Sequence, residues 1–278
     1  MEKKLRVTVP KYIEEIIQGD IEEFKITKNF LLNYIFERLK NEKLLDEYYK
    51  EGDKEVIQFN LNKKNKENYY EFLEEKNVQV EADFFRKLFI KYGNFPKNKR
   101  ELFVFSEIVE RINHGIKEKK IIKIKFRDGN ETKVEPYYIG SSQLEIANYI
   151  FSYDLEKCKF KNYRLNNIVG IYISRDKFQN RDEEFVENVK KNFDPFLSEG
   201  KVIRVKLSDC GEKMFENLKV NRPQVMEKSK NIYSLQCSEE KAKRYFSYFM
   251  NEVEILEPLS LREWFIDKYK KAIEVYEN

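Results

Sequence analysis

The segment Val56-Ile-Gln-Phe-Asn-Leu-Asn62 alternates apolar and polar side chains, which is the pattern of a half-buried β-strand. The same alternation occurs near the start of the chain, in Leu5-Arg-Val-Thr-Val9. Each predicted strand precedes two segments with apolar residues at helical spacing, so a strand-helix-helix element recurs after about fifty residues. Because one strand cannot bury its apolar face alone, the two strands are expected to pair with each other.

The spacing of apolar residues predicts where these helices lie. In the first repeat it predicts a helix over 11–19 and a second one that Thr27 caps and that runs to Leu39. In the second repeat it predicts helices around 69–73 and 84–92.

This order of elements resembles the ribbon-helix-helix family, in which two strands pair antiparallel and their outward polar side chains enter the DNA major groove. The resemblance implies that the outward positions are Lys4, Arg6, Thr8, Gln58, Asn60 and Asn62. Arginine can bind guanine, and glutamine or asparagine can bind adenine, through paired hydrogen bonds. Outward polar side chains also suit a ribbon that serves only as a scaffold or as a dimer platform, so both interpretations stay open.

The middle of the chain is richest in predicted strands. The sequence predicts an amphipathic helix over 102–119, followed by two strands that an Asp128-Gly129 hairpin turn connects. Three further strands follow along the chain. Five strands in so short a segment predict a small, strongly bent sheet or a partial barrel. The predicted strands cover 121–126, 132–136, 145–153, 159–165 and 168–174.

Two short motifs in this segment resemble those of the WYL domain of prokaryotic regulators. Asn148-Tyr-Ile150 stands where that family has its Trp-Tyr-Leu tripeptide, and Lys161-Asn-Tyr-Arg-Leu-Asn-Asn-Ile168 is similar to its Arg-x-Phe-Arg-Leu-Asp-Arg-Ile pattern. The resemblance implies an Sm-like β-barrel with a pocket for nucleic acid or a nucleotide-derived ligand, formed by Tyr149, Lys161 and Arg164. The alternative is that Tyr149 packs on the sheet while Arg164 pairs with an acidic residue.

Cations and aromatic residues alternate along the same strands. The net charge of the chain is only +4, but 119–133 and 157–164 are distinctly basic. Lysines that neutralise phosphates, beside aromatic rings on which bases stack, are typical of surfaces that bind single-stranded nucleic acid. A solvated strand face would show the same pattern. The further candidate contacts are Lys123, Lys125, Lys159 and Tyr163.

The last hundred residues predict an α/β extension. After a helix over 182–192, strands over 201–207, 231–237 and 253–256 and a weak strand near Pro223 alternate with helices over 209–217 and 240–249, which is a ferredoxin-like order. The final strand and the helix that runs to Tyr276 resemble the extension of many WYL proteins. Within it, Arg262 is a candidate for nucleic-acid contact or for dimer pairing.

Composition argues against most catalytic classes. Three cysteines at wide spacing and one histidine, His114, give neither a disulfide framework nor a zinc site, and the chain has no phosphate-binding GxxxxGK[ST] or GxGxxG motif. We therefore expect no metal, no cofactor and no enzymatic activity, with a carboxylate-dependent nuclease as the remaining catalytic alternative. No membrane-spanning run or signal segment is evident, so a cytoplasmic protein is expected.

Taken together, the sequence predicts an α+β protein with three parts: tandem ribbon-helix-helix units at 1–98, a WYL barrel at 99–180 and a ferredoxin-like extension at 181–278. This combination resembles the WYL accessory proteins encoded beside RNA-targeting CRISPR effectors. The resemblance implies a non-catalytic protein that binds single-stranded RNA, modulates the effector nuclease and forms a homodimer. The alternative is a transcriptional regulator whose ribbon binds DNA and whose WYL domain senses a nucleic-acid or nucleotide ligand.

Overall fold

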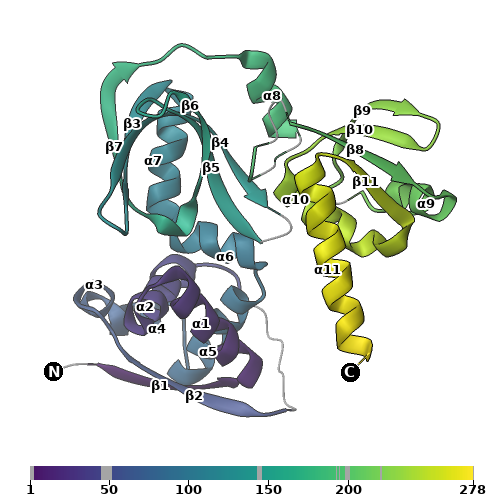
Figure 1. Ribbon diagram of the computed structural model, residues 1–278. Helices are drawn as coiled ribbons and strands as arrows, with labels where there is room; N and C mark the ends of the chain where they lie inside the picture. The colour runs from purple at the N-terminus through teal and green to yellow at the C-terminus, as the bar shows by residue number, and fades with distance from the viewer. Residues whose placement is uncertain are drawn as a thin grey trace. The chain divides into compact units, whose positions relative to one another are not determined.

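The computed structural model describes residues 3–44, 52–142, 146–191, 193, 195–197, 201–219 and 221–277 (Figure 1). Its elements form an α+β protein with several antiparallel sheets. The chain divides into two compact units, 1–109 and 110–278. The finer division at residues 98 and 180 stays a prediction. None of the helices in the described ranges is both long enough and apolar enough to cross a membrane.

The first unit contains a two-stranded antiparallel ribbon, in which β1 (Lys4–Pro10) pairs with β2 (Lys54–Asn60). Leu5, Val7 and Val9 are buried, as are Ile57 and Phe59 on the other strand. The polar residues between them therefore lie on the opposite face of the ribbon. The predicted pairing of the two alternating segments is confirmed.

The helices of this unit repeat with nearly the same spacing as the strands. α1 (Lys11–Phe24) and α3 (Lys63–Glu67) begin 52 residues apart, and α2 (Lys28–Leu39) and α5 (Glu81–Gly93) begin 53 residues apart, with the short α4 (Tyr69–Glu75) between α3 and α5. Thr27 caps α2 as predicted, because its hydroxyl accepts a hydrogen bond from the Phe30 N–H at 3.2 Å. α1 runs past the predicted end at Gly19, because Asp20 and Phe24 are buried on the same face as Ile13 and Ile17.

A buried ion pair fixes the next helix, α6 (Lys97–Val104), to α1. The guanidinium of Arg100 donates to both carboxylate oxygens of Asp20, at 2.6 and 3.1 Å, and the Tyr92 hydroxyl donates to the same carboxylate at 2.6 Å. The predicted single helix over 102–119 is wrong, because the helix is interrupted at Phe105. A separate helix, α7 (Ser106–Lys117), follows.

The second unit begins with a five-stranded antiparallel sheet in the order β6-β5-β4-β3-β7. Its two edge strands do not pair with each other, so the described strands form an open sheet, and the Sm-like β-barrel that the family resemblance implies is wrong. The sheet is nevertheless bent, because the ring of Phe126 at the end of β3 lies 5.2 Å from that of Tyr163 on β6. Part of the predicted third strand, at 145, lies outside the described residues. The strands are β3 (Lys120–Phe126), β4 (Glu131–Ser142), β5 (Ala147–Asp154), β6 (Lys159–Arg164) and β7 (Ile168–Lys177).

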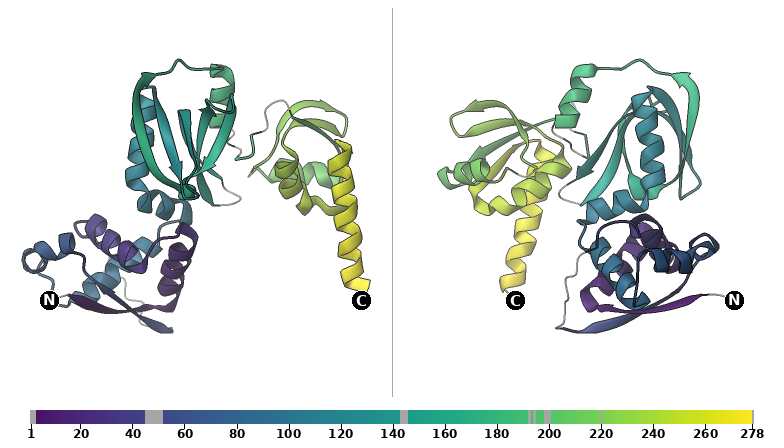
Figure 2. Two further views of the ribbon diagram at one scale, coloured as in Figure 1. Left: turned by 60° about the vertical axis from the view of Figure 1, so that its left-hand side comes forward. Right: turned by 180° about the vertical axis from the view of Figure 1, so that it is seen from behind.

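The two faces of this sheet are covered by different helices (Figure 2). α7 lies against the face that we call the inner face, where a Cβ added to Gly115 would come within 2.7 Å of Ile122. α8 (Glu183–Lys191) covers the outer face, where the ring of Phe185 lies 4.9 Å from Phe160 and 6.0 Å from Phe151. Each strand residue can therefore be assigned to one face by its register.

The C-terminal part of the unit contains a four-stranded antiparallel sheet in the order β11-β8-β10-β9, with three helices and a 3₁₀ turn. The predicted helix over 240–249 ends at Phe246, where the chain turns into the 3₁₀ segment and Met250 adopts a left-handed backbone with φ of 50°. The elements are β8 (Val202–Leu207), α9 (Asp209–Asn217), β9 (Gln224–Ser229), β10 (Ile232–Gln236), α10 (Glu239–Phe246), η2 (Ser247–Glu252), β11 (Val253–Glu257) and α11 (Leu259–Glu277).

Candidate nucleic-acid interface

The outward face of the β1–β2 ribbon gathers most of the polar residues that the sequence predicted there. Lys4 lies opposite Asn60, and Arg6 lies opposite Gln58, while Thr8 lies opposite Val56. Lys4, Arg6 and Gln58 are exposed, and Thr8 and Asn60 are half-buried. The ribbon therefore presents a cationic and amide-bearing surface to solvent.

Arg6 and Gln58 lie at the centre of the internal repeat. They are 52 residues apart, the same spacing that separates the starts of α1 and α3, and they face each other in the strand register. The two repeats are thus arranged around an approximate two-fold axis that passes between these side chains. A guanidinium and a carboxamide, both able to form paired hydrogen bonds with a base edge, stand side by side at this axis.

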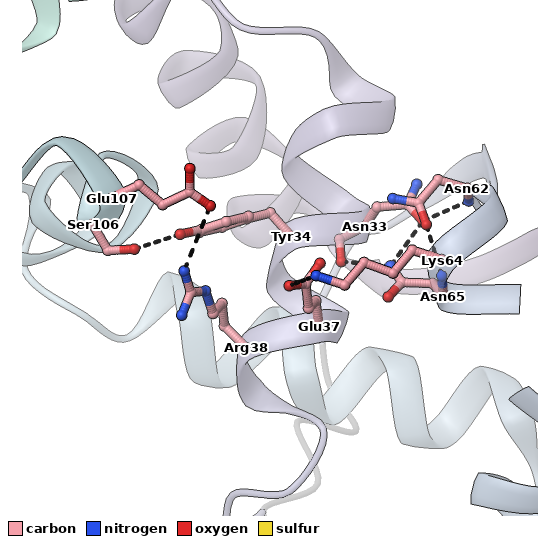
Figure 3. A network of polar contacts seen from close by, with 9 residues as sticks. All are labelled: Asn33, Tyr34, Glu37, Arg38, Asn62, Lys64, Asn65, Ser106 and Glu107. Atoms are coloured by element: carbon pink, nitrogen blue, oxygen red, sulfur yellow. Dashed lines mark hydrogen bonds and ion pairs between the residues drawn. The ribbon is translucent and has the colours of Figure 1, made fainter. Parts of the chain in front are cut away.

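Asn62 does not lie on the strand to which the sequence assigned it. β2 ends at Asn60, and the side-chain oxygen of Asn62 accepts a hydrogen bond from the Asn65 N–H at 2.8 Å, which caps α3 (Figure 3). The backbone N–H of Asn62 donates to the side-chain oxygen of Asn33 at 2.8 Å, and the Asn65 amide donates to the Asn33 carbonyl at 2.9 Å. The structure gives Asn62 a capping position, and its role in binding stays a prediction.

The central sheet separates the three residues of the predicted WYL pocket. Tyr149 on β5 lies opposite Arg164 on β6, so both side chains belong to the outer face. Lys161 lies opposite Ser152 on the inner face, together with Lys159 and Tyr163. Residues three apart in a strand point to opposite faces, so Lys161 lies on the other face of β6 from Tyr149 and Arg164, and the role of the three residues in binding stays a prediction.

On the outer face, Tyr149 packs beside a phenylalanine that sequence reasoning missed. Its ring lies 6.3 Å from that of Phe193, which is also 6.0 Å from the ring of Tyr138. Phe193 occupies the space over Gly140, the residue opposite Tyr149, since a Cβ at Gly140 would overlap the Phe193 ring. Tyr149 and Arg164 are both half-buried, so the tyrosine is neither enclosed in the core nor fully exposed.

On the inner face, lysines gather near the turn between β5 and β6. The ammonium of Lys161 lies 5.1 Å from the centre of the Tyr163 ring. Burial lowers the pKa of Lys161, and the nearby ammonium groups of Lys157 and Lys159 lower this pKa further, against the opposing effect of Asp154. The strand register places these lysines near one another, since Lys159 lies opposite Asp154, Lys161 lies opposite Ser152, and Lys157 belongs to the turn that joins β5 and β6.

The carboxylate within this cluster is already supplied with hydrogen bonds. Asp154 accepts from the backbone N–H groups of Glu156 and Lys157, at 2.9 Å each, and from the hydroxyl of Tyr163. Burial acts to raise the pKa of Asp154, but these hydrogen bonds outweigh it and hold the pKa below its usual value. Burial and the bond to Asp154 raise the pKa of Tyr163. The lysine cluster, defined as Lys157, Lys159 and Lys161, thus carries more positive charge than Asp154 balances.

The other two predicted lysines of the sheet lie on the outer face of β3. Lys123 donates to Glu131 at 3.0 Å, and its ammonium lies 5.2 Å from the centre of the Tyr172 ring. Lys125 is exposed and lies opposite Glu131 in the register with β4. The carboxylate of Glu131 therefore reduces the net positive charge at this position.

Arg262 fixes α11 to the sheet beside it. Its guanidinium donates to the Glu254 carboxylate at 2.9 Å and to the Ile255 carbonyl at 2.7 Å. Both acceptors belong to β11, so the side chain has a structural role, while its predicted contact with nucleic acid or a dimer partner stays a prediction. Among the described residues, no group of three or more His, Cys, Asp or Glu side chains could hold a metal ion.

Comparison with solved structures places this architecture among known folds. The chain shares its fold with a CRISPR Cas-related protein. The crystal structure of that protein matches 100% of this chain and 95% of its own length, with a TM-score of 0.78 and 15% sequence identity. At this identity the likeness concerns the fold alone.

A second match is the proteasome accessory factor B/C (PafBC) of Arthrobacter aurescens, with a TM-score of 0.35 and 13% identity over 99% of this chain and 50% of that one. This likeness is too weak to bear on the fold. No protein-family model matches the chain, and no curated protein matches it.

Proposed function

We propose that this chain is a non-catalytic nucleic-acid-binding protein whose ligand is single-stranded RNA and which modulates an RNA-targeting CRISPR effector nuclease. In this proposal the first unit is a tandem ribbon-helix-helix, the central sheet is an open, Sm-like WYL domain, and the C-terminal sheet is a ferredoxin-like extension. The observation that carries the proposal is the lysine cluster beside Tyr163. The fold shared with a CRISPR Cas-related protein supports the link to CRISPR systems.

The lysine cluster suits a phosphate group. The three lysines lie on and beside the turn that carries Asp154, and this carboxylate already accepts hydrogen bonds from Tyr163 and from two backbone N–H groups. A bound phosphate would relieve the repulsion among the lysines, which is the physical reason that anions are favoured there. The ammonium of Lys161 lies over the ring of Tyr163, so a base that stacks on this ring would take its place and leave the ammonium beside the phosphate.

The edge position of β6 favours a single strand over a duplex. This strand carries Lys159 and Lys161 on the inner face and Arg164 on the outer face, where Tyr149 is its neighbour. A flexible single strand can bend around such an edge and use both faces. Duplex nucleic acid is stiff, with a persistence length of about 50 nm for DNA, and it would meet only one face.

Salt-dependent binding to labelled oligonucleotides tests this proposal. We expect a single-stranded RNA to bind more tightly than the duplex of the same sequence. The logarithm of its binding constant should fall by about 0.7 per phosphate contact for each tenfold rise in salt concentration. Lys161→Ala should reduce this slope by about one contact. The matched control is Lys213→Ala, an exposed lysine on α9. Equal binding of RNA by wild type and Lys161→Ala would contradict the proposed site.

Recognition of duplex DNA by the ribbon is a second candidate function. The observation that favours it is the pair Arg6 and Gln58, exposed at the approximate two-fold axis. A transcriptional regulator of this kind would bind one duplex sequence selectively and lose that selectivity in Arg6→Ala with Asn60→Ala. Selection of duplex sites from a random pool separates this function from RNA binding, since an RNA-binding accessory would enrich no duplex sequence.

The absence of catalysis is part of the proposal and has its own test. Labelled RNA incubated with the protein and Mg²⁺ or Mn²⁺ should remain intact, whereas a carboxylate-dependent nuclease would cleave it. Cleavage that the metal ion requires and that copurifies with the protein would contradict the non-catalytic assignment.

A further inference from the structure

The outer face of the central sheet has an exposed region beyond the part that α8 covers. α8 packs on the rings of Phe151 and Phe160, which belong to β5 and β6. On β7, at the other edge of the sheet, the side chain of Tyr172 is 53% exposed (Figure 1). Lys125 on β3 and Lys133 on β4 are exposed as well. A ligand can therefore reach this region from solvent.

Tyr172 stands at one end of a row of side chains that crosses three strands. In the strand register Lys123 on β3 lies opposite Tyr172 on β7, and it also lies opposite Lys133 on β4. Side chains that lie opposite each other in neighbouring strands share one face of the sheet. Adjacent strands are about 4.8 Å apart, so the Cα atoms of the aromatic residue and the two lysines lie within about 10 Å.

A glycine lies beside the Tyr172 ring on the same face. Gly170 precedes Tyr172 by two residues in β7, and a Cβ added to it would lie 3.6 Å from the Tyr172 ring. This is an ordinary contact distance, so packing within the protein does not require a glycine there. The backbone does not require one either, because Gly170 is not one of the described glycines whose φ is positive. Glycine within a strand often marks a place that a ligand approaches closely.

The lysines around Tyr172 carry more positive charge than the neighbouring carboxylate balances. Glu131 accepts a hydrogen bond from Lys123 at 3.0 Å and lies opposite Lys125 in the register. Three lysines share this carboxylate, so the region favours an anion such as a phosphate. The ammonium of Lys123 lies 5.2 Å from the centre of the Tyr172 ring. A base that stacks on this ring would take its place and leave the ammonium beside the phosphate. We call this region the β7 patch, and it consists of Tyr172, Gly170, Lys123, Lys125 and Lys133.

The β7 patch and the lysine cluster lie on either side of one short turn. β6 and β7 are joined by the three-residue turn Leu165–Asn167. Tyr172 lies nine residues after Tyr163, so their Cα atoms are at most about 30 Å apart. One RNA strand can therefore contact both places.

We propose that the β7 patch is a second contact site for single-stranded RNA, in which a base stacks on Tyr172 above Gly170 and the lysines bind the adjoining phosphates. This inference rests on the proposed function and extends the RNA path from β6 to the outer face of β7. A nucleotide carries its phosphate next to its base, so a tyrosine one strand away from Lys123 fits one nucleotide unit. The bases of a duplex are already paired and stacked on one another, so the site requires a single strand.

Binding of single-stranded RNAs of about 4 to 16 nucleotides, the range of site sizes in small single-strand-binding folds, tests the proposal. Tyr172→Ala should weaken binding of the longer RNAs at least about fivefold with an unchanged salt slope, because stacking is not ionic. Tyr172→Phe keeps the ring and should bind within about twofold of wild type. Lys133→Ala should instead reduce the salt slope by about one contact. The matched control is Tyr248→Ala, which removes a 69% exposed ring on η2.

An abasic oligonucleotide separates stacking from charge. It keeps the phosphates but has no bases, so wild type and Tyr172→Ala should bind it equally. Gly170→Val should weaken binding of RNA as Tyr172→Ala does, because the new side chain occupies the place of the base. Thermal unfolding of each variant checks that the protein remains folded.

The outcomes separate this inference from the proposed function. Wild type that binds no single-stranded RNA would overturn both. A loss of binding in Lys161→Ala, with no effect of Tyr172→Ala at any RNA length, would overturn the β7 patch alone. A loss in Tyr172→Ala that is equal for RNA and for the abasic oligonucleotide would overturn stacking, as would a Tyr172→Phe variant that binds no better than Tyr172→Ala.

Discussion

Replacing Lys157 by alanine should change both the strength and the pH dependence of RNA binding. In the free protein, burial and the ammonium groups of Lys157 and Lys159 lower the pKa of Lys161. A phosphate bound at the lysine cluster raises that pKa, so binding takes up a proton at any pH between the lowered pKa and the pKa in the complex. RNA affinity should therefore fall as pH rises through this window, by at most about tenfold per pH unit for one proton.

The size of the effect follows from the electrostatics of the cluster. A lysine and a phosphate about 4 Å apart in a solvated site attract each other by about 1 kcal/mol. Lys157→Ala should thus weaken RNA binding roughly fivefold at neutral pH. The same change removes a neighbouring positive charge, so the pKa of Lys161 moves back toward its usual value and the fall in affinity begins at a higher pH.

Fluorescence anisotropy with a labelled single-stranded RNA, at constant ionic strength from neutral pH up to the ordinary lysine pKa of about 10.4, measures both effects. Lys213→Ala is again the control, because its affinity and its pH profile should match those of wild type. The reasoning is refuted if Lys157→Ala weakens binding without any displacement of the pH profile. It is refuted as well if wild-type affinity rises with pH.

Three further predictions concern the packing around the candidate sites. Asp20→Ala leaves the guanidinium of Arg100 buried without its carboxylate, so urea denaturation should show a loss of about 3–5 kcal/mol in the free energy of unfolding, and a loss under 1 kcal/mol would contradict the ion pair. Gly140→Ala should displace the ring of Phe193 and destabilise the protein by about 1–3 kcal/mol, visible in thermal unfolding and in the aromatic NMR signals. Asn62→Ala should cost about 1 kcal/mol by removing the cap of α3, yet leave nucleic-acid affinity unchanged; a loss of affinity at unchanged stability would instead favour its predicted role in the ribbon.

The ribbon was predictable because its information is local. Alternation in the two segments fixes which side chains point inward, and the repeat gives each strand its partner, so Arg6 and Gln58 emerge on the outward face as expected. The end of β2 was not predictable from alternation alone, since Asn62 continues the polar pattern. The sequence does contain a signal for this end, because asparagine is a favoured residue at the N-cap of a helix and Asn62 immediately precedes α3.

The candidate site on the central sheet was only partly predictable. The residue types and strands were identified correctly, but the family pattern suggested one pocket where the strand period of two sends Lys161 and Arg164 to opposite faces. Phe193 beside Tyr149 depends on a segment beyond α8 that returns to the sheet, and no local pattern specifies such a contact. The only sequence signal for it is Gly140, a strand glycine that leaves room for a ring.

The predicted helix boundaries were wrong where burial in the folded protein outweighed the local helix propensity of the sequence. α1 continues past Gly19 because Phe24 has a place in the core, although glycine is unfavourable within a helix. The break at Phe105 is the reverse case. The apolar periodicity continues through this residue and predicts one helix, but α6 ends at Val104 and α7 begins at Ser106. The open sheet in place of a closed barrel likewise depends on the pairing of β6 and β7, which are separated only by the short turn Leu165–Asn167.

Ultraviolet cross-linking of single-stranded RNA to the full chain, followed by mass spectrometry of the peptides, tests the central claim most directly. If RNA passes over the edge strand β6, the main adduct should lie on the peptide that contains Tyr163, and Lys161→Ala should reduce its yield. Adducts confined to the β1–β2 ribbon, at RNA concentrations where binding is saturated, would contradict the claim.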